Sequence, residues 1–298
     1  MPVDVDFGDT SQVFNCGPAS VGVPGSPAGL AAAADRWGEL PLADLAAPAA
    51  ALAREGVPVN AEQGYVFQIL EQLLSLSPES AAEFAPAGCP LKPGELFRSP
   101  ELATTIERLG RDGPAPFYSG DLAAATVAHV RGAGGLLNAA DLAAYAPIVR
   151  APANVGFRGR RVLTNPPPSA GGILLALALS ALDEQPAAPS AVELASVMET
   201  VQALRTPEFV DGLAEPGFLE RTLGSRLGAT THISVLDAGG RSCAVTCTNG
   251  EGSGVVVPGT GIHLNNIMGE EDLNPLGFFR MPAGRRMPSH RLSEFYQP

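Results

Sequence analysis

The stretch GATTHISVLDAGGRSCAVTCTN, residues 228–249, contains two runs of alternating apolar and polar residues joined by DAGGR. Alternation with a period of two predicts β-strands, and the short turn rich in Asp and Gly predicts that the two strands form a hairpin. The preceding segment, Pro207 to Gly228, has little periodicity. We therefore expect an exposed loop that ends where the hairpin begins.

The first two thirds of the chain are rich in alanine and have the period of helices, with boundaries marked by Pro and Gly. A short strand then leads through three prolines into a buried helix, and paired strands follow. This order predicts an α+β fold in which sheet packs between helices. The helices are expected at about 26–38, 42–54, 61–75, 99–111, 120–131, 138–145 and 170–182, the first with Ser26 as its N-cap.

Composition excludes several classes of function. The chain has 298 residues, 45% of them hydrophobic, and a formal net charge of -12, which disfavours nucleic acid as a partner. The longest apolar run, 170–182, is shorter than the ~20 residues of a membrane-spanning helix. The start has no basic and apolar leader, so we expect a cytoplasmic protein. Four scattered cysteines predict neither a disulfide framework nor a metal site, and no cofactor is expected.

Thr230 stands at the border between the loop and the hairpin. A threonine hydroxyl is a weak nucleophile and needs a base within hydrogen-bonding reach. If the bond between Ala229 and Thr230 is cut, the new α-amine, with an ordinary pKa of ~7.7 to 8.0, can be that base. The alternative is an ordinary threonine at the start of a strand. The histidines lie beside no nucleophile-elbow sequence, so they indicate no Ser-His-Asp triad.

Three separated stretches resemble the gamma-glutamyltranspeptidase family of N-terminal-nucleophile hydrolases. They are GPASVGVPGSPAGLAAAADRWGELPLADLAAPAAALAREGVPV (17–59), TNPPPSAGGILL (164–175) and residues 228–266, from GATTHIS to HLNN. The resemblance implies a layered αββα sandwich made as one precursor. It also implies self-cleavage into residues 1–229 and 230–298, which would stay associated as one composite domain. The implied reaction is transfer of a γ-glutamyl group, from donors such as glutathione, to water or an amine.

The resemblance also implies roles for individual residues. Thr230 would be the nucleophile that carries the acyl ester, and Thr248 would hydrogen-bond to it. Asn249 would contact the substrate, Glu270 would bind the α-ammonium of the glutamyl group, and Ser289 would help to hold its α-carboxylate. The chemistry agrees, because a zwitterionic head needs an acid for its ammonium and donors for its carboxylate. A solvated acidic run at Glu270 and a plain turn at Ser289 are the alternatives.

Family members are longer at both ends. The arginine that clamps the substrate carboxylate lies before position 1 of this sequence, and the Gly-Gly pair of the oxyanion hole lies after Ser289. We therefore expect a truncated member with weak or absent turnover. Two alternatives stay open: an acylase of the same superfamily that acts on another amide, and an inactive remnant that only binds partners.

Overall fold

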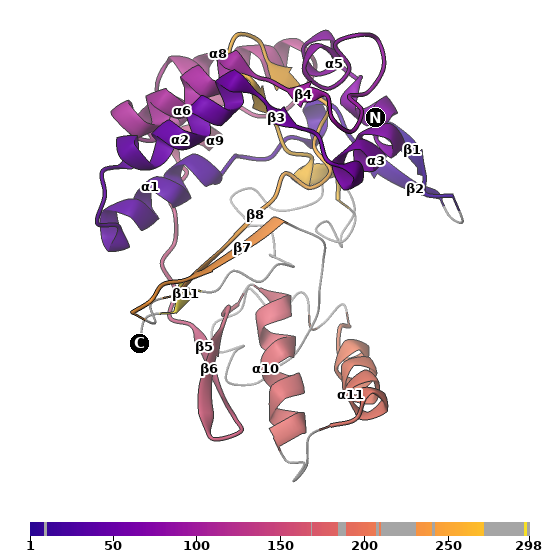
Figure 1. The fold of residues 1–298 in the computed structure, drawn as a ribbon, viewed down its shortest axis with the longest axis vertical. Helices are drawn as coiled ribbons and strands as arrows, with labels where there is room; N and C mark the ends of the chain where they lie inside the picture. The colour runs from indigo at the N-terminus through magenta and orange to yellow at the C-terminus, as the bar shows by residue number, and fades with distance from the viewer. Residues whose placement is uncertain are drawn as a thin grey trace. The chain divides into compact units, whose positions relative to one another are not determined.

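The computed structural model describes residues 1–8, 11–167, 169–183, 189–206, 209, 231–239, 242–270 and 295–296. The chain forms two compact units (Figure 1). Unit 1 consists of Met1–Ile148 and Asn249–Glu271, and unit 2 consists of Val149–Thr248 and Asp272–Pro298. The predicted cut before Thr230 would divide the sequence at another place, within unit 2. This cut stays a prediction.

The elements of unit 1 are mainly helices, joined by short antiparallel strand pairs β1–β2, β3–β4 and β9–β10. They are β1 (Pro2–Asp6), β2 (Ser11–Asn15), the 3-10 helix η1 (Pro18–Ser20), α1 (Ser26–Trp37), α2 (Leu42–Glu55), β3 (Val57–Pro58), α3 (Ala61–Ile69), α4 (Glu71–Leu74), α5 (Pro78–Phe84), β4 (Leu96–Phe97), α6 (Pro100–Asp112), α7 (Ala115–Tyr118), α8 (Asp121–Gly132), α9 (Ala139–Ala143), β9 (Val256–Val257), β10 (Ile262–His263) and the 3-10 helix η2 (Ile267–Gly269).

The alanine-rich sequence of unit 1 allows helices to pack closely. Ala46 and Ala50 of α2 and Ala103 of α6 are buried. A Cβ added to Gly110 of α6 would come within 2.9 Å of the Ala46 Cβ, so the two helices approach too closely for a larger side chain. The predicted helices at 26–38, 42–54, 99–111, 120–131 and 138–145 are confirmed, although Gly25 rather than Ser26 occupies the capping position of α1.

The helix predicted over residues 61–75 is wrong in one respect, because it is interrupted at Leu70 and forms α3 and α4. The cause is tertiary packing. Leu73 and Leu74 are buried against the β1–β2 hairpin, where they meet Val3 and Phe14 in one hydrophobic cluster. Burial of such side chains is worth about 1.5–3 kcal/mol each, which exceeds the cost of a local break in a helix.

The segment 249–270 lies inside unit 1, among helices that come from the first half of the sequence (Figure 1). Val257 and Leu264 are almost fully buried and share a hydrophobic cluster with Val21, Val130 and Leu142. The core of unit 1 is therefore built from segments that lie far apart in the sequence.

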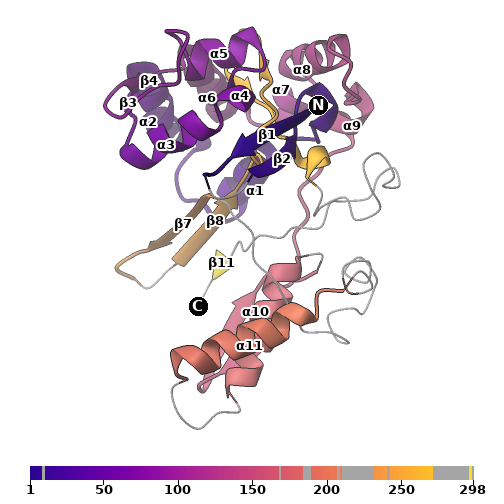
Figure 2. The same cartoon turned by 90° about the vertical axis from the view of Figure 1, so that its right-hand side faces the viewer.

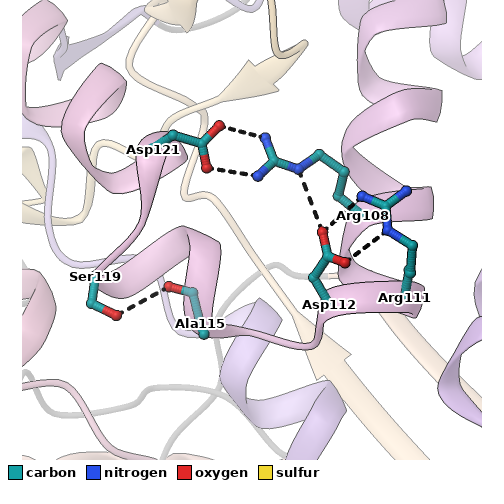
Figure 3. A network of polar contacts seen from close by, with 6 residues as sticks. All are labelled: Arg108, Arg111, Asp112, Ala115, Ser119 and Asp121. Atoms are coloured by element: carbon teal, nitrogen blue, oxygen red, sulfur yellow. Dashed lines mark hydrogen bonds and ion pairs between the residues drawn. The ribbon is translucent and has the colours of Figure 1, made fainter.

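A polar network on the surface of unit 1 connects α6 with α8 (Figure 3). Nη1 of Arg108 donates to Oδ2 of Asp121 over 2.7 Å, and Nη2 donates to Oδ1 over 2.6 Å. Asp112 accepts from Arg111 over 2.7 and 2.8 Å and lies 3.8 Å from Nε of Arg108. The hydrogen bonds from Arg108 lower the pKa of Asp121 to about 2.

Unit 2 is built on the helix that the sequence predicts to be buried. Its elements are β5 (Ala153–Phe157), β6 (Arg160–Thr164), α10 (Ala170–Asp183), α11 (Ala191–Ala203), β7 (Thr231–Leu236), β8 (Ser242–Cys247) and β11 (Phe295–Tyr296). α10 packs against the β5–β6 hairpin on one side and α11 on the other (Figures 1 and 2). Within the described residues, no helix has the length and apolar character needed to cross a bilayer.

The predicted hairpin is confirmed as β7 and β8. The antiparallel register pairs Thr231 with Cys247 and Leu236 with Ser242. The order of this sheet is β11-β8-β7, so β8 is its central strand. Except for Phe209, the predicted loop from Pro207 to Gly228 lies outside the described residues.

Candidate active site

The loop after β8 folds back on the segment that follows β10. Ser253 donates from its N–H and its hydroxyl to the Leu264 carbonyl, over 2.9 and 2.8 Å. Leu264 in turn donates to the Val255 carbonyl over 2.9 Å, and the N–H of Asn266 donates to the Asn249 carbonyl over 3.1 Å. Asn249 and the residues before Glu270 are thus joined in unit 1 by backbone hydrogen bonds.

Glu270 follows the 3-10 helix η2 and directs its side chain inward, since its Oε1 is a buried atom. This oxygen lies directly against Gly250. A Cβ on Gly250 would collide with Oε1 of Glu270 and with Oδ1 of Asn266. The structure therefore places the carboxylate of Glu270 against Gly250, the residue that follows Asn249 in the chain.

The side chain of Asn249 is exposed, and its Nδ2 donates to the His263 carbonyl over 3.3 Å. The backbone carbonyl of Asn249 also accepts from Gly252 over 3.1 Å, which closes a tight turn. Gly250 and Gly252 adopt φ angles of 67° and 92°, in the region that favours glycine. This conformation explains why NGEGSG is rich in glycine.

His263 has a structural position rather than a catalytic one. Burial lowers the pKa of its imidazole to about 4. Its Nε2 accepts a hydrogen bond from the Gly254 N–H over 3.3 Å, and its ring lies 5.5 Å from the ring of Phe84. A neutral ring that already accepts a backbone hydrogen bond supports the structural interpretation of this histidine.

Asn266 and Glu251 were not predicted from the sequence to belong to this cluster. Asn266 is 1% exposed, and its Nδ2 donates to Oε2 of Glu251 over 2.9 Å. The N–H of Glu251 donates to Oδ1 of Asn266 over 3.1 Å. The only sequence signal was two asparagines directly after a short apolar strand, where buried polar side chains need hydrogen-bond partners.

Thr248 directly follows β8 in unit 2, next to Cys247, the register partner of Thr231. The nucleophile candidate Thr230 lies outside the described residues, as do Ala229 and Ser289. The roles predicted for them therefore stay predictions. In the part of the chain that the structure describes, no group of His, Cys, Asp and Glu side chains could hold a metal ion.

Similarity to solved structures defines the class of protein. A cephalosporin acylase from Bacillus halodurans matches with a TM-score of 0.68 and 28% identity, over 85% of this chain and 53% of that one. This likeness confirms the predicted α+β fold of the N-terminal-nucleophile hydrolase type.

The sequence profile of the gamma-glutamyltranspeptidase family matches residues 4–211 and 214–293. The chain belongs to this family. A glutathione hydrolase proenzyme of Pseudomonas aeruginosa is 32% identical over 87% of this chain and 52% of its own length. An acylase ACY 1 proenzyme of a Pseudomonas species is 28% identical over 91% of this chain and 55% of its own length. The chain thus spans about half the length of these relatives.

Proposed function

We propose that the protein is an N-terminal-nucleophile enzyme that cleaves γ-glutamyl amides, with Thr230 as the nucleophile. The observation that carries this proposal is the family match, which extends over both sides of Thr230. The names of the relatives support the same chemistry, because a glutathione hydrolase and an acylase both act on amides. In this proposal the substrate is a small γ-glutamyl donor, and the acceptor is water or an amine.

Maturation would require one cut in the chain. The Thr230 hydroxyl attacks the carbonyl carbon of Ala229, the acyl group moves from nitrogen to oxygen, and water hydrolyses the resulting ester. The products are a carboxylate on Ala229 and a free α-amine on Thr230. That amine is then available as the base for the reaction with substrate.

In the reaction itself, the α-amine accepts the hydroxyl proton while the Thr230 oxygen bonds to the γ-carbonyl carbon. The proton then passes to the leaving amine as the C–N bond breaks, which leaves an acyl ester on Thr230. Water or an acceptor amine attacks this ester by the reverse proton path and restores the hydroxyl. Thr231, which follows Thr230 in the sequence, pairs with Cys247, which precedes Thr248, and this register supports the proposed hydrogen bond between the two threonines.

Glu270 would recognise the ammonium of the donor. The buried position of its Oε1 beside Gly250 supports this role, because a carboxylate that is partly shielded from water attracts a cation more strongly. Asn249, which lies between Thr248 and Gly250 in the sequence, is exposed and would contact the substrate. Ser289 remains the proposed donor to the α-carboxylate.

The second candidate function is hydrolysis of an acyl amide without an ammonium group, which the similarity to acylases favours. A matched pair of chromogenic substrates separates the two functions. A γ-glutamyl anilide and a glutaryl anilide differ only in the α-amino group. We expect the γ-glutamyl compound to have the higher kcat/KM, and the reverse preference would favour the acylase.

Glu270→Gln tests the source of that preference. Removing one partner of a desolvated charge pair costs about 2–5 kcal/mol, so kcat/KM for the γ-glutamyl anilide should fall at least tenfold. The rate with glutaryl anilide should change little. Glu62→Gln, the same exchange at an exposed position of α3, is the control and should behave as the parent protein.

Mass spectrometry of the purified chain tests the nucleophile. The uncut chain has a mass of 30.6 kDa, and a cut should produce a smaller fragment whose N-terminal sequence is TTHIS. Thr230→Ala should stay intact, Thr230→Ser should be cut more slowly, and Thr231→Ala should still be cut. A Thr230→Ala chain that is cut at the same bond would remove Thr230 from the mechanism.

A further inference from the structure

Asn266 has neighbours in three segments of unit 1: the loop 249–251, the 3-10 helix η2, and Cys16 after β2. Its side chain exchanges two hydrogen bonds with Glu251, over 2.9 and 3.1 Å. Its backbone N–H donates to Asn249, and its carbonyl accepts from Gly269 over 2.7 Å. The Cys16 thiol, which directly follows β2, is also near Asn266. A residue that is 1% exposed thus has most of its polar groups in use.

The segments that meet at Asn266 carry the proposed substrate contacts. On one side is the loop with Asn249 and Glu251, and on the other is the 3-10 helix η2, which leads directly into Glu270. Oδ1 of Asn266 and Oε1 of Glu270 both lie against Gly250. A shift of Asn266 would therefore change the distance between Asn249 and the Glu270 carboxylate.

The loop needs such a connection because its backbone has little regular structure. Gly250, Gly252 and Gly254 all have positive φ angles, of 67°, 92° and 68°. Glycine in these positions allows the conformation but also leaves the largest entropy to be lost on ordering. The two hydrogen bonds to Glu251 fix the loop at the residue between the first two glycines.

The buried Cys16 lies near this cluster without adding a charge. Burial, with a contribution from the charge of Glu251, raises the pKa of its thiol to about 11. The thiol is therefore neutral at ordinary pH. The neighbourhood of Asn266 thus holds an uncharged thiol as well as the carboxylates of Glu251 and Glu270.

We propose that Asn266 is a positioning residue, which fixes the loop 249–251 against Glu270 and thereby sets the affinity for the ammonium of the substrate. This inference rests on the proposed function and extends it to a residue that has no contact with substrate. It predicts an effect mainly on KM, because the nucleophile and its base belong to another part of the chain.

Asn265 provides a matched control. It is also buried, at 6% exposure, and its amide exchanges two hydrogen bonds with Gly22, over 2.9 and 3.0 Å. Its Oδ1 also accepts from the N–H of Ile267 over 3.2 Å. The two hydrogen bonds with Gly22 lead away from the loop 249–251, and the one from Ile267 stays within residues 265–267, so the loss of Asn265 should destabilise unit 1 without moving that loop. The comparison of Asn266→Ala with Asn265→Ala separates positioning from general loss of stability.

The first measurement is kinetic, with the γ-glutamyl anilide. Asn266→Ala should raise KM at least tenfold and change kcat less than threefold, whereas Asn265→Ala should leave KM within threefold of the parent. Asn266→Asp keeps the size of the side chain and serves if the alanine variant does not fold. It should raise KM as well, because it puts a carboxylate in place of the donor to Glu251. Equal KM values in the parent and the Asn266 variants would overturn the proposal.

The second measurement is amide hydrogen exchange in the absence of substrate. The Glu251 amide should exchange at least tenfold faster in Asn266→Ala than in the parent or in Asn265→Ala. Unchanged exchange would overturn the proposal even if KM rises. If the parent hydrolyses no γ-glutamyl compound, the proposed function fails, and the exchange rates still decide whether Asn266 fixes the loop.

Discussion

At the scale of single residues, Gly250 combines two constraints that can be measured separately. Its φ of 67° is unfavourable for other residues, and its Cα faces Asn266 and Glu270 so closely that no Cβ fits. Gly259 has a similar φ of 72°, but no atom lies within 4 Å of the place its Cβ would occupy. The two glycines therefore differ mainly in the space around them.

We expect Gly259→Ala to lower the free energy of unfolding by about 1–2 kcal/mol, the usual cost of a left-handed conformation. Gly250→Ala should cost a further ~1–3 kcal/mol for overpacking, and it should also impair binding of γ-glutamyl donors because Glu270 must move. Urea unfolding and KM measurements check both statements. Identical stabilities of the two variants would show that the space beside Gly250 is not restricted.

His263 makes stability depend on pH. Its pKa is about 4 in the folded state and 6.5 as the ordinary value, so the unfolded chain binds its proton first as the pH falls. The contribution of His263 to the free energy of unfolding should be fully present above pH 6.5. It should decrease from there to about pH 4 and then level off. The loss expected from this residue is up to about 3 kcal/mol.

The measurement is urea unfolding of unit 1 between pH 4 and pH 7, followed for the parent and for His263→Gln. The variant should lose much of the slope in this interval. His129→Gln is the control, because it makes the same exchange on α8, and it should keep the slope. A titration of the His263 ring by NMR with a midpoint near 6.5 would contradict the explanation.

At the scale of elements, Arg108 connects α6 to the start of α8 through Asp121. The hydrogen bonds from Arg108, more than the other neighbours, lower the pKa of Asp121 to about 2. Arg108→Gln should therefore raise the pKa of Asp121 towards ~3.9, the ordinary value. A carboxyl titration by NMR measures this shift, and Arg111→Gln, which removes one of the two arginine partners of Asp112, should leave Asp121 unchanged. An Asp121 pKa that stays near 2 in Arg108→Gln would contradict this assignment.

Most helices of unit 1 were predictable because Pro, Gly and capping residues mark their ends. Asn138 is an example: its side chain accepts from the N–H of Asp141, whose side chain accepts from the Asn138 N–H. The break at Leu70 was not predictable, since it depends on Val3 and Phe14, which lie far away in the sequence. Neither strand β1 nor β2 was predicted, although Val3 and Val5 alternate with aspartates in the pattern of a strand.

The sequence also predicted part of the candidate site and missed another part. Asn249 and Glu270 were predicted as substrate contacts from resemblance to a family, and the structure places the Glu270 carboxylate against Gly250, the residue after Asn249. Their roles stay predictions. Asn266 was missed because a buried asparagine carries no charge and no nucleophile that a sequence pattern would mark. Its importance depends on hydrogen-bond partners, and those are known only once the loop is folded.

At the scale of the whole molecule, the composition of unit 1 matters most for maturation. A cut before Thr230 would leave Met1–Ile148 on one fragment and Asn249–Glu271 on the other, and both belong to unit 1. The smaller fragment contributes Val257 and Leu264 to a cluster with Val21 and Val130. The two fragments also share backbone hydrogen bonds, such as that from Gly17 to Ser253 over 2.7 Å.

We therefore predict that the fragments stay associated after the cut. Separation would expose several side chains whose burial is worth about 1.5–3 kcal/mol each, and it would leave backbone groups of the core unpaired. Gel filtration in native buffer should give one peak that contains both fragments. In concentrated guanidinium chloride the fragments should elute separately.

A protease site inserted between residues 229 and 230 makes this test independent of self-cleavage. Leu264→Asp should release the smaller fragment after the cut, because it buries an unpaired charge in the cluster that joins the fragments. Val192→Asp, at a position of α11 that is 79% exposed, should not release it. The core packing implies that the segment 249–270 holds the two fragments together. Separate elution of the parent fragments in native buffer would contradict this. Co-elution that survives Leu264→Asp would instead show that contacts outside this cluster hold the fragments together.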